Sequence, residues 1–290
     1  MIALDILYMY AYYKRMQINS DLRPLHRTAV LASVDMVSTV TIEDLSRATP
    51  CAEWSLAELL THMTVQHRGF AAAARGHGAD PAIWQPATVA DAVAADPAGS
   101  YTAAAAEVID AFASVDQLDA AFALPEFGPG ATFPGSLAIG FHFVDYVVHG
   151  WDVARAMGYP FELPADVLAA ALPIALAVPD TEFRTADSAP FGPAIHSPDQ
   201  ANDLDRILDH LGRSQLETGT RNASTLTNPP IDQQTHNRTR HPAAASPGGT
   251  DDDHILRRRS RHRRGSPAIF RQVKCGRSAA DHTRQRPAQH

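Results

Sequence analysis

The composition of the chain changes abruptly near residue 216, and this break limits what each part can fold into. Residues 216–290 contain 14 Lys and Arg against six Asp and Glu, whereas the preceding residues contain 11 against 26. The basic part also has only eight residues from Ile, Leu, Val, Phe, Met, Trp and Tyr. Burying so few apolar side chains cannot offset the conformational entropy lost on ordering such a segment. We therefore expect an acidic folded part and a disordered basic tail.

A run of arginines at 257–264 is the most basic feature of this tail. Such a cluster can neutralise nucleic-acid phosphates without a fold, which keeps a nucleic-acid-binding protein open as an alternative. Phe270 is the only aromatic residue of the tail, however, so stacking on bases is not indicated. The bias toward Arg, Pro, Ala, His and Gly is also what a GC-rich gene gives in a shifted reading frame. We favour this explanation and do not expect a nucleic-acid partner.

The N-terminal stretch is apolar and aromatic, but it does not have the pattern of a signal peptide or membrane anchor. It ends at Tyr13, short of the roughly 20 residues of a spanning helix, and basic residues follow it. Two cysteines, Cys51 and Cys275, lie on opposite sides of the composition break, which argues against a disulfide framework. We expect residues 1–15 to be an N-terminal extension, the protein to be cytoplasmic, and no membrane to be involved.

Apolar residues recur at helical spacing through most of the acidic part, whereas convincing alternating strands are few. The stretch 124–135 is rich in Pro and Gly and is expected to hold a turn or short strand. The pattern predicts four long helices and two shorter ones, at 21–40, 56–75, 96–112, 136–157, 163–178 and 200–211.

Helix-terminal residues support these ranges. Ser55 and Glu58 form an S-x-x-E capping box, Asp96 precedes a Pro suited to a first turn, and Gly158 suits the end of the fourth helix. Pro173 should kink or break the fifth helix.

The predicted fold class is therefore all-α, a four-helix bundle with a smaller C-terminal attachment. The expected boundaries are 1–15 for the extension, 16–160 for the bundle, 161–215 for the helical attachment and 216–290 for the tail.

The fourth predicted helix carries a cluster of possible metal ligands. At 100° per residue, Asp145 and His149 are 40° apart and His142 is 20° from His149, so all three share one apolar face. His62 lies on the apolar side of the second helix and can meet them if the two helices face each other. The spacing alone is also typical of a surface Asp–His pair, and a lone histidine is commonly a core residue.

Other polar and aromatic residues near this cluster have simpler interpretations. We expect Asp152 to pair with Arg155, three residues further on, rather than to support a metal ligand. Trp54 and Trp151 are predicted to anchor the core. Cys51 precedes a helix start, but no base accompanies it, so a nucleophilic role is not expected.

The sequence motifs around the cluster indicate a family more specifically than the spacing of the candidate ligands does. The segments Thr-Pro-Cys-Ala-Glu-Trp at 49–54, Leu-Leu-Thr-His at 59–62 and His-Gly-Trp-Asp-Val-Ala-Arg-Ala at 149–156 stand in this order. Together they resemble the actinobacterial metal-binding branch of the DinB-like superfamily, which is related to the metal-binding domain of mycothiol-dependent maleylpyruvate isomerase. The likeness covers about 21–213 and implies a DinB-like four-helix bundle.

The resemblance also implies a ligand set, carried over by position: His62, Asp145 and His149, with water or a substrate thiol completing the shell. Asp145 stands where the isomerases have Glu, so direct binding and binding through water both stay open, with His142 as the substitute. Two imidazoles and one carboxylate suit zinc best, with nickel or iron as alternatives.

An open metal position and the resemblance together favour a mycothiol-dependent transferase or isomerase-like enzyme, with a small-molecule thiol and an electrophilic substrate as partners. The substrate-binding and mycothiol-contacting positions of the isomerase's C-terminal region have no match here, so the substrate cannot be carried over. A non-catalytic metal- or small-molecule-binding protein of the same fold is the main alternative.

Overall fold

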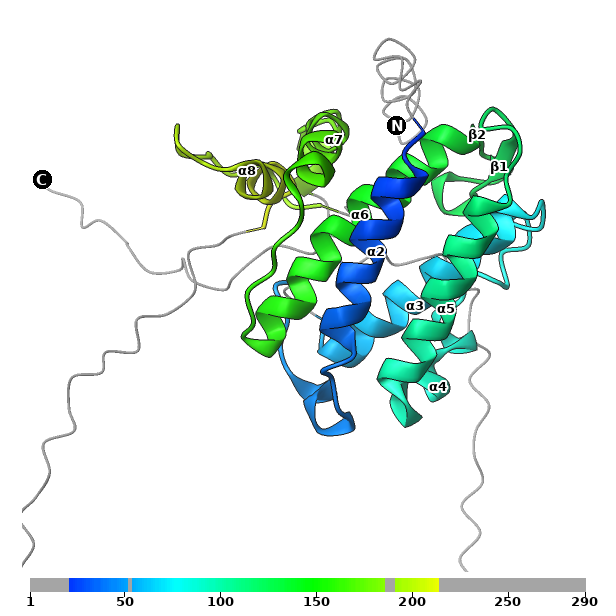
Figure 1. Cartoon of the computed structure of the whole chain (residues 1–290), viewed down its shortest axis with the longest axis horizontal. Coiled ribbons are helices and arrows are strands. Elements are labelled where there is room, and N and C mark those ends of the chain that lie inside the picture. The colour runs from blue at the N-terminus through cyan, green and yellow to red at the C-terminus, as the bar shows by residue number, and fades with distance from the viewer. Residues whose placement is uncertain (1–20, 52–53, 186–190, 214–290) are drawn as a thin grey trace, which may run out of the picture. The chain divides into compact units, whose positions relative to one another are not determined.

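The computed structural model describes residues 21–51, 54–185 and 191–213, and these belong to one compact unit (Figure 1). The predicted extension at 1–15 and the predicted tail at 216–290 lie outside the described residues. The described part is mainly helical, which confirms the predicted fold class.

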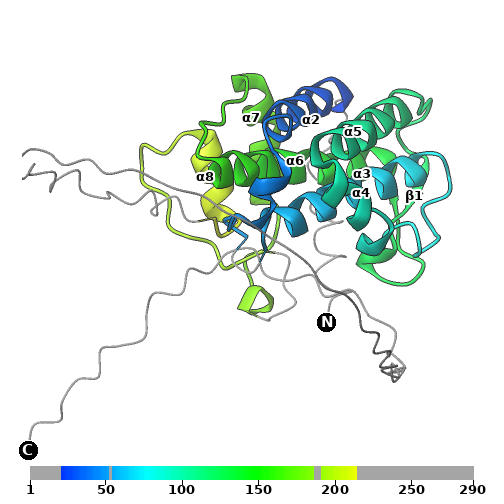
Figure 2. The ribbon, with the colours of Figure 1, turned by 90° about the horizontal axis from the view of Figure 1, so that it is seen from below.

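The four longest described helices pack side by side, as Figures 1 and 2 show. Helix α2 packs against α5 and α6, and α3 packs against the same two helices. Their bounds are Arg23–Val37 for α2, Leu56–Ala74 for α3, Pro97–Ala113 for α5 and Gly135–Met157 for α6.

The predicted helix-terminal residues act as caps. Ser55 accepts a hydrogen bond from the backbone N–H of Glu58, and the Glu58 side chain accepts one from the Ser55 N–H. Asp96 accepts from the N–H of Gly99 at 2.9 Å. Gly158 ends α6 with a φ of 77°, a backbone conformation that favours glycine. These contacts satisfy backbone groups that a helix end leaves unpaired, so the long helices begin and end within a few residues of the predictions.

The Pro- and Gly-rich stretch forms part of a small β-hairpin, in line with the turn or short strand expected there. Strands β1 (Ala121–Ala123) and β2 (Thr132–Pro134) are antiparallel, with Phe122 opposite Phe133. The short helix η3 (Pro125–Phe127) lies in the connection between them. The hairpin contacts α3 and α6, the two helices that carry the predicted ligands.

The remaining described elements are short. Helix α7 packs on α2 and α6, and α8 packs on α7, so the predicted C-terminal attachment lies against the long helices. Helix α7 continues through Pro173 rather than ending there. The short elements are η1 (Ile42–Ser46), η2 (Pro86–Thr88), α4 (Ala90–Ala95), α7 (Ala165–Leu176), η4 (Glu182–Thr185) and α8 (Asp203–His210).

An apolar cluster joins α2, α3 and α6 around the predicted ligands. It includes Leu59, Met63, Tyr146 and Val153, which are all fully buried. Each of the ligand-bearing helices therefore turns one apolar stripe into the core, and its polar ligands lie at the border of that stripe. None of the described helices is both long and apolar enough to cross a membrane.

Candidate metal centre

Three predicted ligands come together between α3 and α6. One ligand atom from each of His62, Asp145 and His149 lies within 4.8 Å of the other two. His149 Nε2 is 3.4 Å from Asp145 Oδ1, and the His62 and His149 rings meet edge to face with centroids 5.3 Å apart. Helices α3 and α6 face each other at this level, as the interpretation of the sequence required.

The three side chains border solvent on one side. The Asp145 side chain is 29% exposed, whereas that of His149 is 6% exposed. The Trp54 ring lies 4.9 Å from the His62 ring and covers part of it. The group is thus held by packing on one side and accessible on the other, as a site that receives a small molecule must be.

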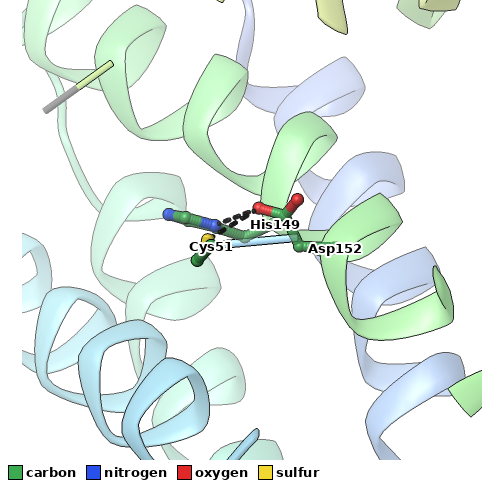
Figure 3. Close-up of side chains that lie close together, drawn as sticks. All are labelled: Cys51, His149 and Asp152. Atoms are coloured by element: carbon green, nitrogen blue, oxygen red, sulfur yellow. Dashed lines mark hydrogen bonds and ion pairs between the residues drawn. The ribbon is translucent and has the colours of Figure 1, made fainter. Parts of the chain in front are cut away.

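The bond between His149 and Asp152 fixes the orientation of the imidazole. His149 Nδ1 lies 2.9 Å from Asp152 Oδ2 (Figure 3). The carboxylate accepts, so Nδ1 carries a proton, and in the neutral imidazole Nε2 is then the nitrogen with the lone pair. Nε2 faces Asp145 Oδ1, so a cation bound between the two residues would accept this lone pair.

Asp152 is fully buried and has a charged partner from the C-terminal segment. Arg213 Nη2 lies 3.3 Å from Asp152 Oδ2. Burial acts to raise the pKa of Asp152, but the Arg213 charge and the bond from His149 outweigh it and leave the pKa lowered. The carboxylate is therefore ionised at neutral pH.

The predicted pairing of Asp152 with Arg155 is wrong. Arg155 instead lies over the Trp151 ring, 5.5 Å from its centroid. Asp152 turns toward the core, where an ionised carboxylate needs a partner, and Arg213 from a distant part of the chain supplies it. The spacing of residues within α6 cannot predict this pair, because Arg213 is 61 residues from Asp152 in sequence.

A second group of candidate ligands, Cys51, His149 and Asp152, shares one imidazole with the first. Its environment does not suit a cation. The Arg213 guanidinium already contacts Asp152, and the His149 nitrogen on this side carries a proton. The Cys51 sulfur lies 3.3 Å from Asp152 Oδ2. Cys51 is not a free cysteine, so its sulfur is not available as a thiolate ligand.

The pKa shifts at the first group fit a cation. Burial is the main cause that lowers the pKa of His62 to about 3, so the ring is neutral and offers a lone pair. Burial also raises the pKa of Asp145, against the lowering effect of His149 and Arg213. Burial disfavours the charged form of a carboxyl group, and a divalent cation would compensate that charge. The donor set therefore fits a divalent metal.

His142 does not join this group. Seven residues separate it from His149, so although the two share a face they are about 10 Å apart along the helix axis. His142 Nδ1 lies 2.8 Å from His26 Nε2, and His142 Nε2 lies 3.2 Å from His67 Nδ1. All three rings are buried, and burial is the main cause of the lowered pKa of each. His142 therefore belongs to a separate chain of core histidines and not to the metal centre.

Two residues near the centre were not singled out from the sequence. Gln66 follows His62 by one helical turn, and its Nε2 donates to Glu126 Oε1 at 2.5 Å. Burial and the charge of Asp145 raise the pKa of Glu126 to about 7, against the lowering effect of Gln66. Glu126 lies in the Pro- and Gly-rich connection, where no periodicity indicates which side chains turn inward.

Comparisons with known proteins find similarity over the helical part of the chain. Residues 26–154 match the family model described as the mycothiol maleylpyruvate isomerase N-terminal domain. Uncharacterized proteins from two strains of Mycobacterium tuberculosis, CDC 1551 and H37Rv, are each 29% identical over 189 residues, which is 65% of this chain and 96% of the relative. A crystal structure of the mycothiol-dependent maleylpyruvate isomerase aligns with a TM-score of 0.47 at 13% identity, over 66% of this chain and 88% of that chain.

Proposed function

We propose that this chain binds one divalent metal and acts on a low-molecular-weight thiol as a transferase or isomerase, because residues 26–154 match the family model of the mycothiol maleylpyruvate isomerase N-terminal domain. His62, Asp145 and His149 are the proposed ligands. Mycothiol is the proposed cosubstrate, since the family is named for its use.

The geometry of the three side chains supports the proposal. His149 Nε2 and Asp145 Oδ1 are 3.4 Å apart, and one ligand atom of His62 lies within 4.8 Å of both residues' ligand atoms. Two ligands at about 2.0–2.1 Å from a tetrahedral zinc ion are about 3.4 Å apart. A cation between the two groups would compensate the charge of the carboxylate and bind the lone pair of the neutral imidazole.

Zinc is the proposed metal. Two imidazoles and one carboxylate offer nitrogen and oxygen donors in a number typical of catalytic zinc, whereas calcium and magnesium prefer oxygen ligands alone. Nickel and iron accept the same donors and remain alternatives.

The chain's own residues would prepare the centre for a small cosubstrate. A bound cation would lower the pKa of a thiol, which makes the reactive thiolate available near neutral pH. Asp152 holds the His149 ring so that Nε2 stays directed at the centre. Three protein ligands leave one position open, and the partly exposed Asp145 marks the side from which a thiol can approach.

The test is thiol consumption by zinc-loaded protein. Mycothiol and a soluble electrophile such as 1-chloro-2,4-dinitrobenzene are mixed with the wild type, with His149→Ala and with the control His77→Ala, which removes an exposed histidine of a loop. We expect turnover in the wild type and the control and none in His149→Ala. Turnover that does not depend on metal would contradict the proposal, and zinc and thiol binding without turnover on a panel of electrophiles would indicate a non-catalytic binding protein.

A further inference from the structure

We propose that Glu126 is the proton-transfer group of this centre, which carries the thiol proton to the product. This inference rests on the proposed function and adds a residue outside the ligand set. It comes from the placement of the carboxyl group on the hairpin that contacts both ligand-bearing helices.

Helix geometry places Glu126 beside the ligands. His62 and Gln66 are four residues apart on α3, so their side chains leave the same face about 5–6 Å apart. Gln66 is 4% exposed, and its amide holds Glu126 Oε1 at 2.5 Å. The amide that holds the carboxyl group thus comes from the residue one helical turn after a proposed ligand, and the charge of a second proposed ligand, Asp145, acts on Glu126.

The connection that carries Glu126 is well supported. The neighbouring Phe127 ring packs against Phe133 and Phe141, with centroids 5.0 and 5.3 Å away. The Leu124 N–H donates to the carbonyl of Ala131 at 3.0 Å across the hairpin. A group held by packing and backbone hydrogen bonds keeps its orientation, as proton transfer at a fixed atom requires.

In the metal-free protein, the electrostatic surroundings allow Glu126 to exist in both forms near neutral pH. Burial raises its pKa to about 7, Gln66 lowers it, and the charge of Asp145 raises it again. Tyr146, which also responds to Glu126 and Asp145, has its own pKa raised and stays neutral. A group poised near the working pH is the most effective at both accepting and donating a proton.

The proton balance of the step is simple. The Glu126 carboxylate takes the proton from the S–H group of the thiol, and the sulfur then forms a bond to an electrophilic carbon of a double bond. The electron pair of that bond moves to the neighbouring atom, to which the carboxylic acid returns the proton. Glu126 ends in its starting form, so thiol and electrophile give one adduct without any further reagent.

The first test does not need metal or activity. Carbon-13 NMR of protein labelled at the Glu side-chain carboxyl, with Glu126→Gln to assign the signal, should show Glu126 titrating near 7 in the metal-free protein. A midpoint near the ordinary value of about 4.3 would overturn the inference even if zinc binds as proposed.

The second test separates the inference from the proposed function. A cation at the centre lowers the Glu126 pKa, so zinc binding at pH 6.5 should release more protons from the wild type than from Glu126→Gln, by up to about one per chain. The control Glu162→Gln, an exposed carboxylate, should match the wild type. Calorimetry in buffers of different ionisation enthalpy measures the difference.

Equal proton release by wild type and Glu126→Gln would overturn the inference while leaving the metal centre intact. Absence of zinc binding in all three proteins would overturn the proposed function and the inference with it. With zinc stoichiometry retained, Glu126→Gln should lower kcat by about 10²–10⁴-fold and remove the limb that Glu126 gives to the pH profile, which in the zinc-loaded wild type lies below pH 7.

Discussion

His149 donates its Nδ1 proton to Asp152 across 2.9 Å, and this bond decides which nitrogen faces the proposed metal centre. Because Asp152 is fully buried and ionised, it holds one tautomer and one ring orientation. The Arg213 guanidinium, 3.3 Å away, compensates the buried charge. The C-terminal segment thus contributes to the centre through Arg213, which compensates the charge of the residue that orients His149.

The first prediction concerns this support. Asp152→Asn should weaken zinc binding about 10–100-fold, because the amide no longer accepts the His149 proton with a full charge. The buried Arg213 also loses its counter-ion, so the free energy of unfolding should fall by several kcal/mol. Competition with a chromophoric chelator measures the affinity, and Asp35→Asn on the exposed face of α2 is the control. Unchanged affinity in a folded Asp152→Asn protein would contradict the positioning role.

The second prediction concerns the length of the carboxylate. Asp145→Glu adds one methylene and restores the residue of the isomerases that the chain resembles. Because the Asp145 side chain is partly exposed, the longer side chain has room to move, and we expect one zinc per chain with equal or tighter affinity. Asp145→Asn should bind weakly. Loss of zinc in the Glu variant would contradict this expectation, and unchanged affinity in Asp145→Asn would show that Asp145 is not a ligand.

The third prediction concerns acid stability. The pKa of His26 falls from 6.5 to about 3 on folding, and those of His67 and His142 are also lowered, mainly by burial. The unfolded chain therefore binds more protons than the folded one below about pH 6.5, so stability falls as the pH decreases from there toward 3. Each such histidine contributes a slope of up to about 1.4 kcal/mol per pH unit.

Urea denaturation at pH 7, 6, 5 and 4 measures this slope. His26→Leu should be less stable at pH 7, because His142 loses a hydrogen-bond partner, but its stability should fall less steeply with acid. Parallel curves for the variant and the wild type would show that His26 titrates normally in the folded protein.

The fourth prediction concerns the packing of α3. A Cβ atom at Gly69 would overlap the Trp84 ring, which is fully buried, so Gly69→Ala should cost about 1–3 kcal/mol of stability. At Gly140 on α6 the nearest atoms, from Ile174 and Leu22, would be 3.7 Å away. Gly140→Ala should therefore be neutral or stabilise by up to about 1 kcal/mol. Equal thermal stability of the two variants would contradict the packing described for Trp84.

Local signals account for what the sequence predicts well. The Ser55–Glu58 capping box, the Asp96 cap and Gly158 each act within one helical turn, so they mark helix ends without knowledge of the fold. Helical periodicity likewise places Asp145 and His149 on one face. The facing of His62 toward them came from the family resemblance rather than from spacing.

Contacts between distant segments account for what the sequence does not predict. Angular position put His142 with His149, but displacement along the helix axis and two partners from α2 and α3 place it elsewhere. The pairing of Asp152 with Arg213 depends on how the C-terminal segment returns to α6. The contact between Glu126 and Gln66 depends on the fold of the hairpin, so the sequence alone did not indicate that Glu126 lies near the centre.

The central claim is that His62, Asp145 and His149 hold one divalent metal, and metal content tests it most directly. Protein made without an affinity histidine tag and without added metal is analysed by inductively coupled plasma mass spectrometry, alongside His62→Ala, His149→Ala and the control His77→Ala. We predict close to one equivalent of zinc in the wild type and the control, and almost none in the other two, with helical content by circular dichroism unchanged. Equal metal content in all four proteins would contradict the claim.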